Sequence, residues 1–244
     1  MTGDPTARFG AALSAVFQEL DWPRLGQLAC EGDGESFYDE ESREALLDAG
    51  LRLAGDLGEA LDRKGTGSGR SLYVGAAVAE LPPILFETII AGRKVFWFNL
   101  PGEEADELNR ALGLVASELG IRLPRVRTEG DFPPGPYDHL WFASILTDPE
   151  HYPALHDHLY ERKGTDLATG RGDLGLDRRN AVRPVRRATE ALEEPAVVVT
   201  SDEEVPFLAE ALASRGLKLE VPERGRTSPV VGDVLRVCQV EAGS

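Results

Sequence analysis

Apolar residues in the first 63 positions recur with the period of an α-helix, and no strand pattern interrupts them. One stripe consists of Phe9, Ala12, Leu13, Val16, Phe17 and Leu20, and a second consists of Leu46, Leu53, Leu57 and Leu61. Spacings of three and four place each set on one face of a helix. The glycine-rich segment KGTGSG at 64–69 predicts a flexible joint. We therefore expect a helical N-terminal extension over residues 1–69.

From residue 70 onward, short apolar runs alternate with helical stripes. The runs predict strands at 71–74, 94–98, 125–128, 139–143 and 196–200, and several are apolar throughout, as in strands covered on both faces. The helices between them are expected to end at Gly92, Gly120 and Gly216, and the last is expected to begin with a capping box of Ser201 and Glu204. This alternation predicts a parallel sheet with helices on both faces.

The C-terminal part breaks this alternation. Two apolar runs at 217–221 and 230–240 are joined by PERGRTSP, which is too short for a crossover helix, so they should pair as an antiparallel hairpin. The expected fold class is α/β: a Rossmann-like, doubly wound domain over 70–244 whose mostly parallel, seven-stranded sheet ends in this hairpin. Because the later strands of an NAD-type fold stay parallel, the hairpin disfavours an NAD(P)-binding oxidoreductase.

Composition narrows the classes of function. The chain has 244 residues with 42 acidic and 26 basic side chains, a formal net charge of -16, so its surface should repel nucleic acids and anionic membranes. No apolar stretch approaches the roughly 20 residues of a membrane-spanning helix, and the N-terminus lacks the order of a signal peptide. We expect a cytoplasmic protein. Cys30 and Cys238 stand apart without metal-ligand spacing and are expected to be small buried residues.

The order of elements resembles that of class I S-adenosylmethionine-dependent methyltransferases. The shared features are a helical preface, a first strand ending in a glycine turn (SLYVGAAVAELPP), a second strand followed by a polar residue (KVFWFNLP), a fourth strand led by YD, and the terminal hairpin. The resemblance covers about residues 48–240. It implies S-adenosylmethionine as the cofactor, held at the carboxyl ends of the strands, with the N-terminal helices as a lid.

The cofactor motifs depart from the family pattern. Family members carry an acidic residue before the first glycine and two further glycines, whereas this chain has Tyr73, Gly75, Ala77 and Ala79 at these places. Asn99 stands where the family has a carboxylate that accepts hydrogen bonds from the ribose, and a neutral amide binds more weakly. The resemblance implies the cofactor-binding set Tyr73, Gly75, Ala76, Ala77, Asn99, Leu100, Asp131, Phe132, Ala143 and Ser144. For EGDF at 129–132, a solvated turn is the alternative.

The acceptor side is expected between the fourth and fifth strands. His151, His156 and His158 fall in one predicted helix at spacings that do not stack them, which disfavours a metal site, and Asp148 is expected to cap that helix. The segment 162–187 has eight basic and three acidic residues, a reversal of the overall charge. Its arginines either receive an anionic acceptor or pair with the acidic surface. The implied acceptor contacts are His151, Arg178, Arg179 and Arg183.

Two functions follow from this resemblance. The first is methyl transfer from S-adenosylmethionine to a small or anionic acceptor that the sequence does not identify. The second is a catalytically inactive domain of the same fold that acts as a ligand-binding or protein-interaction module, because fold alone does not establish function. General nucleic-acid binding and a membrane partner are disfavoured by the charge, and a homodimer stays open.

Overall fold

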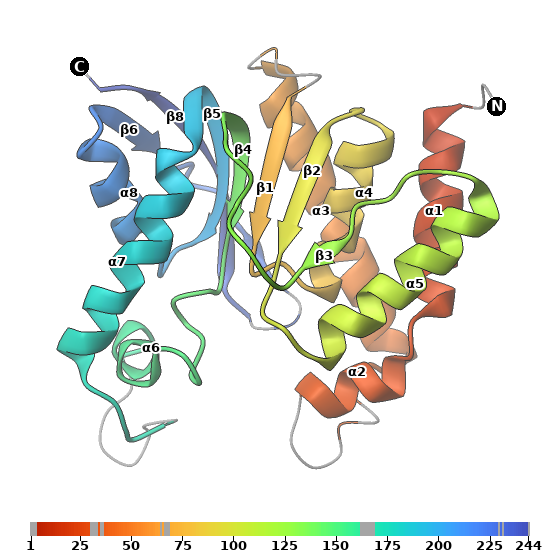
Figure 1. Ribbon diagram of the computed structural model, residues 1–244, viewed down its shortest axis with the longest axis horizontal. Helices are drawn as coiled ribbons and strands as arrows, with labels where there is room; N and C mark the ends of the chain where they lie inside the picture. Colours follow the sequence, from red (N-terminus) through yellow and green to blue (C-terminus); the bar gives the residue numbers. More distant parts are fainter. Residues whose placement is uncertain are drawn as a thin grey trace. The chain divides into compact units, whose positions relative to one another are not determined.

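The computed structural model describes residues 4–29, 34, 37–63, 65, 69–161, 169–228, 230 and 232–243 (Figure 1). The chain forms two compact units. The first consists of Met1–Pro133 with Ser228–Gly232, and the second of Pro134–Thr227 with Asp233–Ser244. The predicted boundary near residue 69 falls inside the first unit, and the division into an extension and an α/β domain stays a prediction.

Three helices open the first unit: α1 (Pro5–Glu19), α2 (Trp22–Ala29) and α3 (Glu40–Arg63). They follow the two predicted stripes, of which Ala12, Leu13, Val16, Leu20 and the four predicted leucines of α3, at 46, 53, 57 and 61, are buried. Helix α1 packs on α4 (Leu81–Ile89) and on α5 (Glu103–Leu119), while α3 packs on α4. Glycine makes this last approach close, because a Cβ at Gly50 would lie 2.6 Å from the Pro82 ring.

The strands of the first unit are β1 (Arg70–Val74), β2 (Lys94–Phe98) and β3 (Val126–Arg127). Strand β2 pairs in parallel with both β1 and β3, so the three carboxyl ends lie at one edge. Figure 1 shows α3 and α4 behind β1 and β2. The short helix η2 (Val78–Glu80) leads into α4, whose first turn contains the two prolines of the motif. Proline suits this place because the first helical amides have no partner within the helix.

The second unit contains β4 (Tyr137–Phe142) and β5 (Leu192–Ser201), which pair in parallel. Strand β8 (Val234–Ala242) lies between β5 and β6 (Leu217–Glu220) and is antiparallel to both. The short strand β7 (Arg226–Thr227) also pairs with β8. The helices are α6 (Pro153–Leu159), α7 (Leu174–Glu190) and α8 (Val205–Ala213). All six residues of β4 are buried, as its apolar run predicts.

The Rossmann-like α/β class and the C-terminal antiparallel pair are confirmed. The described residues form eight strands, one more than predicted, because β7 was not foreseen. The predicted start of α8 near Ser201 was wrong, because the helix begins at Val205. The Glu204 side chain does not close a capping box with Ser201; it accepts hydrogen bonds from the amides of Ile145 and Leu146. Cys238 is buried, as expected, whereas Cys30 lies outside the described residues. No helix in the described ranges has the length and apolar character to cross a membrane.

Candidate functional site

The turn after β1 is joined to the end of β2 by hydrogen bonds to two carbonyls, those of Phe98 and Ala76. Gly75 is exposed, adopts φ +74°, and donates its amide to Phe98 O at 2.9 Å. The Ala76 carbonyl that follows accepts from Trp97 Nε1 at 2.7 Å and from Asn99 Nδ2 at 3.1 Å. The glycine turn and Asn99 are therefore neighbours, as the resemblance to the methyltransferases requires of the two cofactor motifs.

Both ends of the Asn99 amide have partners within the chain. While Nδ2 donates to Ala76 O, Oδ1 accepts from Leu100 N at 2.8 Å, and the Asn99 backbone amide donates to Arg127 O of β3 at 3.0 Å. Leu100 itself is half exposed, at 51%. A ribose that binds Asn99 must therefore replace at least one of these contacts.

Two carboxylates occupy the amides of the same turn. Glu80 Oε2 accepts from Ala77 N at 2.7 Å, and Glu104 at the start of α5 accepts from the amide of Val78. Removal from water, together with the smaller effect of the neighbouring Glu104, raises the pKa of Glu80 to about 7, although the hydrogen bond from Ala77 N opposes this shift. Burial also raises the pKa of Glu104. Sequence reasoning missed these two glutamates, because no glycine-turn motif includes them.

Tyr73 belongs to a polar cluster beneath this turn. Its buried hydroxyl donates to Glu87 Oε1 of α4 at 2.5 Å, and burial followed by the charge of Glu87 raises the pKa of Tyr73. Glu87 Oε2 also accepts from the Ser71 hydroxyl and from Arg93 Nε, the latter at 2.7 Å, with both charged side chains fully buried. Ser71 and Tyr73 share this face of β1 because side chains alternate along a strand. The Tyr73 side chain thus supports the contact between β1 and α4.

The loop after β3 carries Asp131 and Phe132. The Asp131 side chain is exposed, whereas the Phe132 ring packs edge-on against Phe98 at a centroid distance of 5.0 Å. Phe98 is the last residue of β2, and the Arg127 guanidinium of β3 lies 5.8 Å from its ring centroid. Aromatic and cationic groups therefore gather beside Asn99 at the carboxyl edge of β2 and β3.

In the second unit, the loop after β4 is held by a buried aspartate. Ala143 is buried, and Ser144 adopts φ +59°, a conformation that is costly for a residue with a Cβ. The Ser144 hydroxyl donates to Asp233 Oδ2 at 2.8 Å, and the Tyr160 hydroxyl donates to Asp233 Oδ1 at 2.6 Å. Burial and this hydrogen bond raise the pKa of Tyr160. These contacts stabilise the strained turn.

Glu204 fixes the next two residues of the same loop. Its Oε1 accepts from Ile145 N at 2.6 Å and from Leu146 N at 2.7 Å, and the side chain is fully buried. Burial raises the pKa of Glu204 to about 7, although the two backbone hydrogen bonds oppose this shift. From the sequence, Glu204 was predicted to cap a helix. Its contact with the loop after β4 is visible only in the tertiary structure.

The surroundings of His151, His156 and His158 differ from one another. His151 is exposed and lies before α6, so the predicted helix through all three was wrong. Asp148 does not cap a helix; it accepts from the amides of Glu150 and His151 in a turn, and its Oδ2 lies 2.9 Å from His151 Nδ1. His156 is buried against Thr147 O, and His158 contacts Arg178. No group of three or more ligating side chains in the described ranges could hold a metal ion.

The basic segment begins outside the described residues, at 162–168, and continues into α7. Arg178 Nη2 lies 2.7 Å from His158 Nε2, and Arg186 forms an exposed ion pair with Glu190 at 3.1 Å. Arg179 and Arg183 are exposed, and no contact within the described part of the chain neutralises either of them. The predicted pairing with the acidic surface therefore applies to only part of this set.

Comparison with known proteins gives matches in structure but none in sequence. No family model and no curated protein matches the chain. The structure of the StiE O-MT segment matches with 13% identity and a TM-score of 0.51, covering 94% of this chain and 86% of that one. The chain has the class I methyltransferase fold. An O-methyltransferase from Thermotoga maritima matches with 13% identity and a TM-score of 0.46, over 79% of this chain and 66% of that one. A methyltransferase from Pyrococcus furiosus matches with 12% identity and a TM-score of 0.42, over 72% of this chain and 76% of that one.

The methyltransferase fold explains why the carboxyl ends of the strands are the place to look for a ligand, since open α/β sheets bind ligands there. In the first unit this edge presents Gly75, Asn99, Leu100 and Asp131. Within the second unit, the loop of Ala143 and Ser144 follows the carboxyl end of β4. At identities near 13% the likeness shows the fold alone, so activity has to be argued from these residues.

Proposed function

We propose that the protein binds S-adenosylmethionine at the carboxyl edge of β1, β2 and β3 and transfers its methyl group to a small or anionic acceptor. The observation that carries the proposal is the hydrogen bond between Asn99 Nδ2 and Ala76 O, directly beside the exposed Gly75. Gly75 allows an adenosyl ligand to approach the backbone, and Asn99 offers an amide to its ribose.

The acceptor side needs few catalytic groups, because the sulfonium of S-adenosylmethionine is already activated and the protein mainly aligns the acceptor for in-line attack. His151 suits the role of general base. The Asp148 carboxylate can only accept, so the imidazole donates from Nδ1 and leaves Nε2 as the proton acceptor for an acceptor hydroxyl or amine. Arg179 and Arg183 would bind an anionic acceptor group, whereas Arg178 is engaged by His158.

A second function is favoured by the same contacts at the turn. Asn99 is bonded at both ends of its amide, and the Ala77 and Val78 amides are bonded to Glu80 and Glu104. A turn whose polar groups are satisfied within the chain suits a catalytically inactive methyltransferase fold that acts as a binding module. The two functions differ in one measurable property, the affinity for the methyl donor.

The variant Asn99→Asp is expected to bind S-adenosylmethionine about tenfold more tightly than the wild type. A carboxylate accepts hydrogen bonds from ribose hydroxyls about twice as strongly as a neutral amide. It also cannot donate to the Ala76 carbonyl, which keeps its bond from Trp97, so the oxygen that replaces Nδ2 is available to the ribose while the other oxygen still accepts from Leu100 N. Calorimetric titration with S-adenosylmethionine and S-adenosylhomocysteine measures the dissociation constants of the wild type, Asn99→Asp and Asn99→Ala.

Asn180→Asp is the matched control, because it adds the same charge at an exposed position on α7 and should leave the affinity unchanged. Donor binding through position 99 is supported if Asn99→Asp binds S-adenosylmethionine more tightly than the wild type and the wild type binds it more tightly than Asn99→Ala. If neither the wild type nor Asn99→Asp gives heat at millimolar ligand, donor binding is rejected and the inactive module remains.

A further inference from the structure

Helices α7 and α8 form a groove in the second unit that the methyltransferase proposal does not use. Its volume is about 450 Å³. The apolar lining comes from Val182 and Val185 of α7 and from Phe207 and Ala211 of α8. Arg215, which also lines the groove, donates to the carbonyls of Thr189 and Leu192. These hydrogen bonds hold Arg215, which follows α8, against the end of α7. Both helices contribute lining residues at spacings of three and four, so one face of each helix borders the groove.

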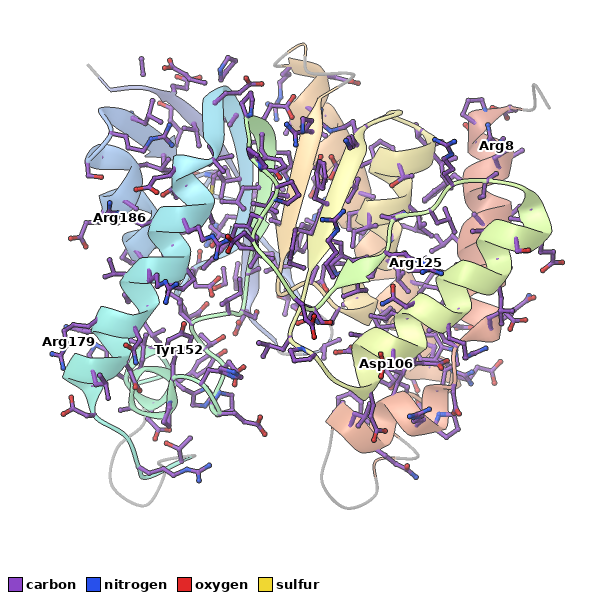
Figure 2. The ribbon with its side chains drawn as sticks, in the orientation of Figure 1. Arg8, Asp106, Arg125, Tyr152, Arg179 and Arg186 are labelled. Atoms are coloured by element: carbon purple, nitrogen blue, oxygen red, sulfur yellow. The ribbon has the colours of Figure 1, made fainter. Side chains whose placement is uncertain are left out.

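A basic stripe runs along the groove on α7. Arg179, Arg183 and Arg186 recur at i, i+4 and i+7, which places them on one side of the helix, and Arg186 also lines the groove. Figure 2 shows Arg179 and Arg186 projecting from the outer side of α7. Between them Val182 is 51% exposed. A row of three guanidinium groups thus borders an apolar surface on a chain whose net charge is -16.

We propose that this surface, the α7–α8 groove with its arginine stripe, binds an acidic amphipathic polypeptide segment. The apolar side chains of such a segment would pack on Val182, Val185 and Phe207, and its carboxylates would pair with Arg179 and Arg183. The two kinds of contact lie on neighbouring sides of α7, as they do on an amphipathic helix or strand. Helix α7 carries five arginines and no lysine, and the planar guanidinium fork binds carboxylates in a bidentate manner.

Charge complementarity selects a polypeptide over a nucleic acid. Glu190 and Glu210 also line the groove, and Glu190 is paired with Arg186. A phosphate backbone carries charge at every unit and would be repelled by these carboxylates, whereas a peptide can place apolar or basic side chains opposite them. The inference shares Arg179 and Arg183 with the proposed acceptor side but does not depend on methyl transfer, since the groove itself is lined by other residues of α7 and α8 and peptide binding is measured without a methyl donor.

Fluorescence anisotropy with labelled synthetic peptides tests this inference on the full chain. The probe is a helical peptide of alternating leucine and glutamate stripes, and the comparison peptide has lysine in place of each glutamate. We expect saturable binding of the acidic peptide, at least tenfold tighter than that of the lysine peptide, and weaker binding as salt is raised. Equal binding of both peptides overturns the inference, as does tighter binding of a single-stranded DNA oligonucleotide.

The double variant Arg179→Glu/Arg183→Glu locates the binding surface. This variant should bind the acidic peptide at least tenfold more weakly than the wild type. The control Arg52→Glu/Arg63→Glu on α3 adds the same charge and should change the affinity for the peptide less than threefold. Phe207→Ser tests the apolar half of the surface with no change of charge, and we expect a similar loss. Circular dichroism confirms that each variant is folded. An acidic peptide that binds both double variants equally contradicts the proposed surface.

Discussion

Replacing Glu87 with alanine is expected to lower the free energy of unfolding of the first unit by about 3–5 kcal/mol. The side chains of Glu87 and Arg93 are both fully buried, and Glu87 Oε2 lies 2.7 Å from Arg93 Nε. Without the carboxylate, the guanidinium stays in the core as an uncompensated charge. The hydroxyls of Ser71 and Tyr73 lose their acceptor as well. Urea unfolding at pH 7, followed by tryptophan fluorescence, measures the loss.

The matched control is Asp48→Asn on α3, which removes an exposed partner of Arg52. Side chains that are 52% and 63% exposed form this pair, so we expect a change of at most about 0.5 kcal/mol. Glu87→Gln provides a milder variant if the alanine protein does not fold, because its amide oxygen still accepts from Arg93. Equal effects of Glu87→Gln and Asp48→Asn would show that the buried ion pair contributes little.

The elements of the fold could be predicted because each is encoded in local periodicity. The leucines at 46, 53, 57 and 61 place one face of α3 in the core, and the apolar run at 139–143 is buried and lies in β4 up to Phe142. The connection between β6 and β8 excluded a crossover helix by length alone. Such signals need only a few neighbouring residues, so they are readable without knowledge of the tertiary structure.

The contacts at the candidate site could not be predicted in this way. The Asn99 side chain bonds to the Ala76 carbonyl, 23 positions away in the sequence. Glu204 bonds to the Leu146 amide over a separation of 58 positions, and Ser144 bonds to Asp233 over a separation of 89. Each of these groups also has an ordinary local role, as a strand end, a helix cap or a turn. Local patterns favour that local role, and only the tertiary fold decides between it and the distant partner.

Two carboxylates with a raised pKa, Glu80 and Glu204, share a physical cause. Both accept backbone amide bonds, which favour the charged form, yet loss of hydration outweighs these bonds and raises each pKa to about 7. A carboxyl whose folded pKa exceeds its unfolded value of about 4.5 stabilises the fold while it is protonated. That stability is complete below pH 4.5 and is lost as the pH rises toward 7.

The variant Glu204→Gln is therefore expected to be more stable than the wild type at pH 8, by up to about 3 kcal/mol. Glutamine reproduces the neutral carboxyl: its oxygen accepts from the amides of Ile145 and Leu146, and its NH₂ group faces the hydroxyls of Thr200 and Ser201. At pH 4.5 the two proteins should be equally stable. Urea unfolding between pH 4.5 and 8 measures the difference, and Glu150→Gln, at an exposed position, should show none.

The direction of this difference decides which form of Glu204 the fold requires. If the free energy of unfolding of Glu204→Gln increasingly exceeds that of the wild type as the pH rises, the fold favours the protonated, uncharged carboxyl. Ionisation of Glu204 then destabilises the loop after β4. A variant that is less stable than the wild type at pH 8 means the opposite, because the charged carboxylate then binds the two amides more strongly than burial penalises it. In that case the loop of Ser144 depends on a full negative charge beneath it, and acid rather than alkali should release it.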